Sequence, residues 1–279
     1  MSRLYRRLAF GLATLTGLAR RGWFIPYRYA ASLPPDGAAG PYPAIADLCA
    51  AATPDFLGLL DRIDSHEADF ARFGGPAPAP RFEQDWFPTL DAVATYALIR
   101  ARAPRRIVEV GSGHSTRVMA RAIADGGLDC RFTAIDPAPR ARLDGLAVDY
   151  VQSTVHDADR TVFDMLEAGD VLFIDSSHVL MPGSDVDLLF NQVLPRLKPG
   201  VVVHIHDIFL PDDYPAAWGW RGYNEQQGVA CLLQGGWQLL WASRYVQTRL
   251  ADRLAASVVA RLPCPAGSLP ASIWLTRGL

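Results

Sequence analysis

The side chains with the greatest chemical potential lie in two short stretches that combine histidine with aspartate. Asp175 and His178 belong to the first, and His206 and Asp207 to the second. An unperturbed histidine has a pKa of about 6.5, so His178 or His206 is a candidate general base that takes a proton from a hydroxyl. Asp207 would orient that base. His204 shares a strand face with His206 but lies deeper in the apolar run, and we interpret it as structural.

A glycine turn forms a second candidate site, one suited to binding a ligand. Gly111, Ser112 and Gly113 follow an apolar run at 107–110, and Ser115 comes where a helix is expected to begin. Glycine has no side chain, so the backbone of this turn can pass close to a ligand. Serine is a good helix cap. A strand, a glycine turn and a helix in this order are typical of a cofactor-binding βαβ unit.

Two features decide which cofactor suits this turn. Asp136 ends the next apolar run, at the spacing of about 20 residues where an acid accepts hydrogen bonds from ribose hydroxyls. The alternative is that Asp136 only starts the proline-rich turn that follows it. Thr116 stands where a nicotinamide dinucleotide fingerprint needs its third glycine. Glu109 is unfavourable beside a pyrophosphate but would suit a cationic sulfonium and amino group.

Alternating apolar runs and helical segments must position these residues. Continuous β-branched runs without polar alternation predict strands buried on both faces of a parallel sheet. The runs are 106–110, 132–135, 148–151, 171–174 and 201–205, with 238–242 and 272–276 completing the sheet. Crossover helices are expected at 115–126 and 183–197, and a long helix from Gln84 to about Ala103. The predicted fold class is therefore α/β, a doubly wound and mostly parallel sheet with an N-terminal helical cap.

Ligands bind such sheets beyond the carboxyl ends of the strands, and both candidate sites follow strand ends. The chain divides into an N-terminal helical region, residues 1–80, and an α/β domain, residues 81–279. A run rich in glycine and proline at 74–80 separates them. Half of the 279 residues are apolar and the net charge is -2, which excludes a disordered chain and argues against a nucleic-acid-binding protein. Four dispersed cysteines without a CxxC pair indicate reduced thiols in a cytoplasmic protein.

The first 35 residues contain six arginines and no acidic residue. The apolar stretch at 8–18 is too short for a membrane span, which needs about 20 residues. Arginines at 20–21 occupy the place of a signal-peptide cleavage site. Two interpretations of residues 1–30 remain open. One is a helix that lies on an anionic membrane surface, and the other is a helix packed on its own domain or on a second subunit in a homodimer.

Taken together, these motifs resemble those of class I S-adenosylmethionine-dependent methyltransferases. The residues that carry the resemblance are Glu109, Gly111 and Gly113 of the first motif, Asp136 of the second and Asp175 of the fourth. The stretches 173–178 and 206–209 look like the bacterial methyltransferase-24 family. The resemblance covers residues 84–279. It implies a seven-stranded, Rossmann-like sheet whose last two strands form an antiparallel pair.

The resemblance also implies the roles of the cofactor-binding residues. The cofactor would be S-adenosylmethionine, with Glu109, Gly111 and Gly113 around its methionine part and Asp136 at its ribose. Ser112, Ser115 and Asp175 would complete this site, and the segment 84–87 would be a lid.

A divalent metal ion is a further implication. A related group of small-molecule O-methyltransferases holds such an ion on acids after the fourth and fifth strands, and Asp175 and Asp207 match these positions. The third ligand there is typically asparagine, whereas this chain has Ile208. The alternative is that both acids orient the histidines and the amino group of the cofactor.

The loop after the fifth expected strand is dense in aromatic residues and is the candidate acceptor site. Its candidates, together with one residue of the lid, are Tyr214, Trp218, Trp220, Arg221, Tyr223 and Trp86. The aromatic rings could wall a planar or sugar-like acceptor, and Arg221 could pair with a carboxylate or phosphate. Alternatively, the aromatic residues seal the loop to the core or form a dimer contact.

These observations favour a methyltransferase that acts on a hydroxyl of a small molecule or glycan. Two alternatives stay open. The first is a non-catalytic protein of the same fold that binds the cofactor at a membrane surface. The second is a nicotinamide-dependent oxidoreductase, which Thr116 and Glu109 disfavour. The expected location is cytoplasmic, with membrane association undecided.

Overall fold

The computed structural model describes residues 3–278 of the chain. The chain divides into two compact units, and the boundary in the sequence falls between Pro35 and Asp36. This division differs from the boundary predicted near residue 80. The helices between residues 36 and 80 belong to the same unit as the sheet, because their apolar side chains are part of one continuous core.

The first unit contains helix α1 (Arg3–Leu15) and one short 3-10 helix, η1 (Ala30–Ser32). Among the described residues, no single helix is long and apolar enough to cross a membrane. Helices α2 (Pro43–Ala51) and α3 (Thr53–Ser65) of the second unit reach the necessary length and apolar composition only as a pair, with a bend of 55° between them. Their apolar side chains that pack in the core are Ile45, Cys49, Phe56, Leu59, Leu60 and Ile63.

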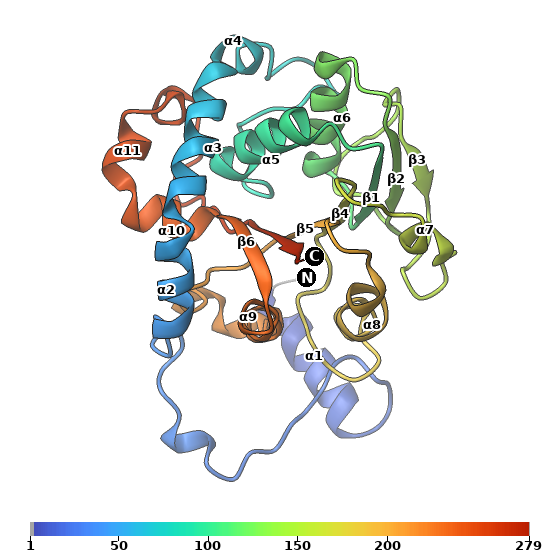
Figure 1. Ribbon diagram of the computed structural model, residues 1–279. Helices are drawn as coiled ribbons and strands as arrows, with labels where there is room; N and C mark the ends of the chain where they lie inside the picture. Colours follow the sequence, from blue (N-terminus) through green and yellow to red (C-terminus); the bar gives the residue numbers. More distant parts are fainter. Residues whose placement is uncertain (1–2, 279) are drawn as a thin grey trace. The chain divides into compact units, whose positions relative to one another are not determined.

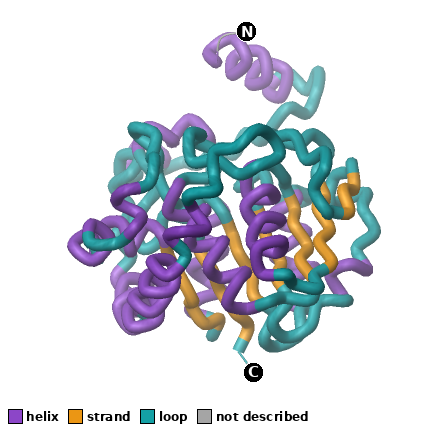
Figure 2. Tube along the Cα trace, turned by 90° about the horizontal axis from the view of Figure 1, so that it is seen from above, coloured by secondary structure: helices purple, strands orange, loops and turns teal. Residues whose placement is uncertain are grey.

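A seven-stranded sheet forms the centre of the second unit, with the strand order β3-β2-β1-β4-β5-β7-β6 (Figures 1 and 2). The strands are β1 (Arg106–Val110), β2 (Arg131–Ile135), β3 (Asp149–Val151), β4 (Val171–Ile174), β5 (Val202–Ile205), β6 (Trp237–Ala242) and β7 (Ile273–Arg277). Strands β1 to β5 pair in parallel, and β7 pairs antiparallel with both β5 and β6. The predicted seven-stranded sheet with an antiparallel last pair is confirmed.

Helices cover both faces of this sheet, as Figure 1 shows. Helices α5 (Thr89–Arg102) and α6 (His114–Gly126) lie on one side, and α8 (Asp185–Leu188) and α9 (Glu225–Gln234) on the other. The remaining helices of this unit are α4 (Glu67–Phe70), α7 (Thr161–Asp164), α10 (Ser243–Arg249) and α11 (Ala251–Ala255), with the short turns η2 (Leu189–Val193), η3 (Leu194–Arg196), η4 (Ala216–Arg221) and η5 (Val258–Arg261). The arrangement is the doubly wound α/β fold that the sequence predicts.

Two helices differ from the predicted ranges because proline intervenes. Helix α5 begins at Thr89 rather than at Gln84, since Pro88 precedes it with an extended backbone. Gln84 instead closes a turn, in which its Oε1 accepts a hydrogen bond from the Phe87 N–H at 2.8 Å. The helix expected at 183–197 breaks into α8, a π turn and a 3-10 turn that contains Pro195.

The fold brings the carboxyl ends of four strands to one edge of the sheet. Strand order reverses between β1 and β4, which is the switch point where such sheets bind ligands. The glycine turn follows β1, Asp136 follows β2, Asp175 follows β4 and His206 follows β5. The residues that the sequence singles out therefore meet at this edge.

Candidate active site

The glycine turn is built around a close approach of two backbone segments. Gly111 has a φ of +82°, and a Cβ atom there would lie only 1.9 Å from the carbonyl oxygen of Asp175. The Asp175 N–H in turn donates a hydrogen bond of 2.8 Å to the Val110 carbonyl. Only glycine fits at this point, because every other residue would collide with the chain leaving β4.

Glu109 stabilises the start of helix α6 through hydrogen bonds to two hydroxyl groups. It is fully buried, and its two carboxylate oxygens accept hydrogen bonds of 2.6 Å from the hydroxyls of Ser115 and Thr116. The Thr116 hydroxyl also accepts a hydrogen bond of 2.9 Å from the Gly113 N–H. Burial raises the pKa of Glu109 to about 8. The structure therefore places Glu109 and Ser115 inside the scaffold of the turn, and it gives Thr116 a reason to stand where a dinucleotide fingerprint has glycine.

Asp136 joins the ends of β1 and β2. Its Oδ2 accepts hydrogen bonds from the backbone N–H of Ser112 at 2.5 Å and from the Ser112 hydroxyl at 3.2 Å. Its Oδ1 accepts a hydrogen bond of 2.7 Å from the Ala138 N–H, which forms the turn after β2. The side chain is half-buried. Asp136 thus starts a turn, as one interpretation of the sequence holds, and it also presents a carboxylate beside the glycine turn.

The segment expected to act as a lid reaches this turn through Arg140. The guanidinium of Arg140 lies 4.2 Å from the ring centre of Trp86, and the Arg140 N–H donates a hydrogen bond of 3.2 Å to the Ser112 carbonyl. Trp86 is 54% exposed, so much of its ring is free to contact another molecule. The structure therefore brings Trp86 to the cofactor side of the site rather than to the aromatic loop.

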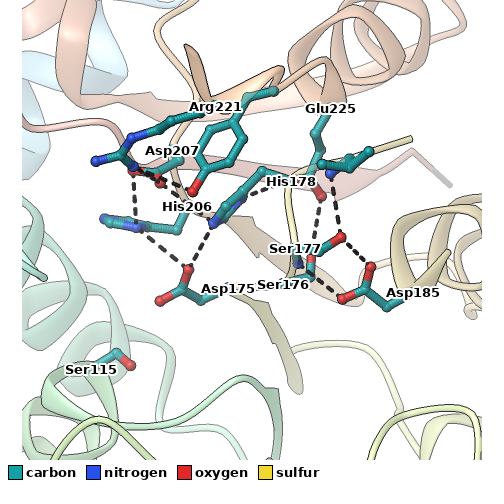
Figure 3. Close-up of polar contacts among 12 residues, drawn as sticks. Ser115, Asp175, Ser176, Ser177, His178, Asp185, His206, Asp207, Arg221 and Glu225 are labelled. Atoms are coloured by element: carbon teal, nitrogen blue, oxygen red, sulfur yellow. Dashed lines mark hydrogen bonds and ion pairs between the residues drawn. The ribbon is translucent and has the colours of Figure 1, made fainter. Parts of the chain in front are cut away.

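The two histidine–aspartate stretches converge in one cluster, drawn in Figure 3. His178 Nε2 lies 3.3 Å from Asp175 Oδ1 and 3.4 Å from Asp207 Oδ2. His206 Nδ1 lies 3.6 Å from Asp207 Oδ1 and 3.8 Å from Asp175 Oδ1. Both histidines are buried. The four residues that the sequence nominates for chemistry therefore form one alternating set of rings and carboxylates.

Two further acids complete the cluster, and sequence reasoning missed both. Glu225, the first residue of α9, is fully buried and places Oε2 2.9 Å from His178 Nδ1. Asp91, in the first turn of α5, places Oδ2 3.4 Å from His206 Nε2 and accepts backbone hydrogen bonds from Ala271 and Ser272. A signal for Glu225 exists in the sequence, since it is an acid at the end of the aromatic loop; Asp91 offers none.

The carboxylates set the charge of both histidines. Burial lowers the pKa of His178, but Asp207, Asp175 and Glu225 more than offset this and hold it well above 6.5. Burial likewise opposes the charge of His206, whose neighbouring carboxylates raise its pKa to about 9. Burial disfavours the charge of Asp175, yet the imidazoles lower its pKa to about 2. Both rings therefore carry a proton at neutral pH, and a protonated ring cannot accept another.

Two residues of the histidine–carboxylate cluster have a strained backbone. His178 and Asp207 have φ values of 61° and 55°, in the left-handed region that residues other than glycine rarely adopt. The carbonyl of His178 accepts hydrogen bonds from the N–H groups of Asn224 and Glu225 at 3.1 and 3.3 Å, which hold this conformation. Strain of about 1–3 kcal/mol per residue persists where the surroundings enforce it, and it concentrates at functional sites.

His204 lies in the core, where the sequence analysis puts it. Its ring stacks on Phe173 with 3.6 Å between the ring centres, and its Nε2 is 2.9 Å from the Ser272 hydroxyl. Burial lowers its pKa well below 6.5, so the ring is neutral.

Part of the aromatic loop faces the cluster. The guanidinium of Arg221 lies 3.8 Å from the ring centre of Trp218, and its Nη1 lies 3.8 Å from Asp207 Oδ2. The same Nη1 donates a hydrogen bond of 3.3 Å to the hydroxyl of Tyr223, whose ring packs against His178 with 4.7 Å between centres. Tyr223 therefore packs on His178 and Arg221 approaches Asp207, as Figure 3 shows for Arg221, while Trp218 packs on Arg221.

The other two aromatic candidates of the loop differ in position. Tyr214 is buried against Phe209, and its hydroxyl accepts a hydrogen bond of 3.3 Å from the Gln226 N–H. It closes the loop on the core, which corrects its predicted role in the acceptor wall. Trp220 is 50% exposed, with its ring centre 5.6 Å from the Arg221 guanidinium.

The acids proposed as metal ligands do not fit that role. Within the described part of the chain, no group of three or more histidine, cysteine, aspartate or glutamate side chains is arranged to hold a metal ion. The carboxylates of Asp175 and Asp207 face two imidazolium rings instead.

Comparison with known proteins gives one family. Residues 108–208 match the methyltransferase-24 family model, described as a methyltransferase domain. Among curated proteins, none matches the chain.

Solved structures with a remote likeness include a methyltransferase of Podospora anserina bound to S-adenosylhomocysteine (SAH). The two sequences are 13% identical, the match covers 92% of this chain and 100% of the other, and the TM-score is 0.43. A putative O-methyltransferase from Klebsiella pneumoniae is 15% identical over 79% of this chain and 90% of its own, with a TM-score of 0.39. An O-methyltransferase from Bacillus cereus in complex with SAH is 16% identical over 79% of this chain and 91% of its own, with a TM-score of 0.38.

The matched stretch begins inside β1 and ends just after Asp207, so it contains the glycine turn, Asp136 and most of the histidine–carboxylate cluster. Residues 108–208 therefore match the methyltransferase family that the sequence motifs resemble.

Proposed function

We propose that this protein transfers a methyl group from S-adenosylmethionine to a hydroxyl of a small molecule or glycan. The observation that carries the proposal is the glycine turn at the switch point of the sheet, with the carboxylates of Asp136 and Asp175 beside it. A cationic cofactor with a ribose suits this setting, because Asp136 can accept from ribose hydroxyls and both acids favour a positive charge.

The residues present fit that cofactor. Gly111 and Gly113 leave the backbone of the turn open, and Ser112 is fixed by Asp136. Trp86 would cover the bound cofactor from the lid. When bound, the cofactor supplies a methyl group on a sulfonium, and the chain has to hold the acceptor in line with it.

A hydroxyl acceptor must lose its proton, and the cluster limits which group can take it. His178 Nδ1 lies 2.9 Å from Glu225, whereas the carboxylates around His206 lie 3.4 Å or more from its ring nitrogens, so we assign His178 the positioning of Asp207. His206, whose pKa is about 9, is our candidate base. The proton of the hydroxyl would pass to a ring nitrogen of neutral His206 while the oxygen forms its bond to the methyl carbon. The bond between this carbon and the sulfonium sulfur would break in the same step, with SAH as the leaving group. The rate should then rise as the pH increases from neutral toward 9.

Isothermal titration calorimetry with S-adenosylmethionine, SAH and NAD tests the proposal. Micromolar affinity corresponds to about -8 kcal/mol, which calorimetry measures readily. Asp136→Ala should abolish binding of the first two ligands. Asp144→Ala is a matched control, since Asp144 is an exposed acid whose ion-pair partner is Arg142. A folded wild-type protein that binds neither would refute the methyltransferase proposal, and binding of NAD alone would favour the oxidoreductase alternative.

A further inference from the structure

The first unit of the chain exposes a continuous apolar helix face. In α1, Tyr5, Leu8, Leu12 and Leu15 recur at intervals of three and four residues, which places them on one side of the helix. Each is between 56% and 61% exposed. Arg7 falls outside this row. The helix is therefore amphipathic, with a strip of leucines on one side.

A second apolar group follows the helix. Trp23, Phe24, Ile25 and Tyr27 are consecutive or nearly so, and each is between 44% and 66% exposed. Tryptophan and tyrosine are enriched where hydrocarbon meets water, because each ring has an apolar body and one polar atom. Such a group suits a boundary between lipid and water better than a uniformly polar partner.

Positive charge is interleaved with these aromatic rings. The unit has six arginines and no acidic residue. The guanidinium groups of Arg20, Arg21 and Arg28 lie between 5.6 and 5.8 Å from the ring centres of Trp23, Phe10 and Tyr29. The cations thus lie beside the exposed aromatic rings, which lets their stems stay in an apolar layer while the charged ends reach headgroups.

We propose that residues 3–35 bind the surface of an anionic lipid bilayer, with the α1 row and the aromatic group in the boundary between headgroups and acyl chains. The length of α1, 13 residues or about 20 Å, suits a helix that lies in the membrane plane and is too short to cross it. Residues 1–35 contain six arginines and no acid, so their net positive charge favours a negatively charged partner. The leucine strip selects a lipid rather than a nucleic acid, which offers no apolar layer for it.

Vesicle cosedimentation of the full-length protein tests this binding. The probe is vesicles of phosphatidylglycerol and phosphatidylcholine in equal amounts, compared with vesicles of phosphatidylcholine alone. We expect pelleting with the anionic vesicles only, and release at high salt. The triple variant Arg7→Ala, Arg20→Ala and Arg21→Ala should bind about a hundredfold more weakly, while replacement of the same arginines by lysine should preserve most of the affinity.

The matched control removes the same charge from the second unit. Arg131, Arg142 and Arg196 are exposed, and their replacement by alanine should leave pelleting unchanged. Leu8→Gln combined with Leu12→Gln tests the apolar face and should also reduce binding. Circular dichroism checks that each variant keeps the fold of the second unit.

Three results would overturn the proposal. The first is equal pelleting of the wild type and the alanine triple variant with anionic vesicles. The second is a wild type that binds no vesicles but forms a soluble dimer in light scattering, where the two leucine substitutions dissociate this dimer. The α1 row would then be a contact between two copies of the chain. The third is retention of RNA or DNA in place of lipid.

Discussion

His206 should make the stability of this protein depend on pH in a way that reveals its charge. Its pKa rises from the ordinary 6.5 to about 9, because Asp91, Asp175 and Asp207 outweigh the cost of burial. A histidine whose pKa is raised by folding stabilises the native state fully below the pKa of the unfolded chain. It loses that contribution as the pH rises through the folded pKa. At about 1.4 kcal/mol per pH unit, the interval from 6.5 to 9 corresponds to about 3 kcal/mol.

The assay compares the wild type with His206→Gln by urea unfolding at one pH below 6.5 and one above 9. We expect the stability of the wild type relative to the variant to fall by about 3 kcal/mol between these two values. The comparison is needed because Glu109, with its pKa of about 8, titrates in the same interval in both proteins. Nuclear magnetic resonance of the histidine Cε1–H groups measures the pKa of His206 directly, and the variant assigns its signal.

A His206 signal that titrates near 6.5 would refute this reasoning. Parallel stability profiles of the two proteins across the interval would do the same. Either result would mean that the surrounding carboxylates do not hold a charged ring. His206 would then be a neutral base at pH 7, and the methyl-transfer rate would not rise between neutral pH and 9.

Two other substitutions probe the turn and the cluster. Gly111→Ala should destabilise the fold by more than about 3 kcal/mol in thermal or urea unfolding, because the new Cβ would lie 1.9 Å from the Asp175 carbonyl oxygen. Gly127→Ala is the control. The φ of Gly127 is also positive, but no atom lies within 4 Å of its Cβ position, so this substitution should destabilise the fold far less. Glu225→Gln should lower the pKa of His178 and reduce kcat at least tenfold with little change in KM, and it should shift the pH–rate profile. An unchanged profile would give Glu225 a purely structural role, and Glu83→Gln, on an exposed residue, is the control.

The strands could be predicted closely because their burial leaves a direct trace in the sequence. The run at 171–174 is apolar throughout, and β4 occupies these residues, all four of them buried. Helix ends were less predictable. The segment from Gln84 reads as helical by composition, yet residues 85–87 form bends, and the Gln84 side chain closes a turn instead.

The candidate site was predictable where it depends on topology and unpredictable where it depends on packing. Asp175 and Asp207 follow adjacent parallel strands, so the sequence alone brings them together. Asp91 and Glu225 reach the histidines from helices on different sides of the sheet, and no spacing in the sequence encodes that approach. Glu225 and Asp91 help to raise the pKa values of His178 and His206, so the protonation of these two rings depends on acids that the sequence does not reveal. The sequence alone therefore gives no means of predicting whether His178 or His206 is neutral, and so able to act as a general base, at neutral pH.

The charges of the site fall into two halves, and this division narrows the search for the acceptor. Beside the glycine turn, Asp136 and Asp175 provide negative charge, which suits a sulfonium. Beside the aromatic loop, Arg221 provides positive charge, and its Nη1 lies 3.8 Å from Asp207 Oδ2. A partly buried guanidinium next to aromatic rings favours an anionic partner of planar shape. Hydroxyl compounds that also carry a carboxylate or phosphate are therefore the first acceptors to screen, since a neutral compound would leave the charge of Arg221 only partly compensated.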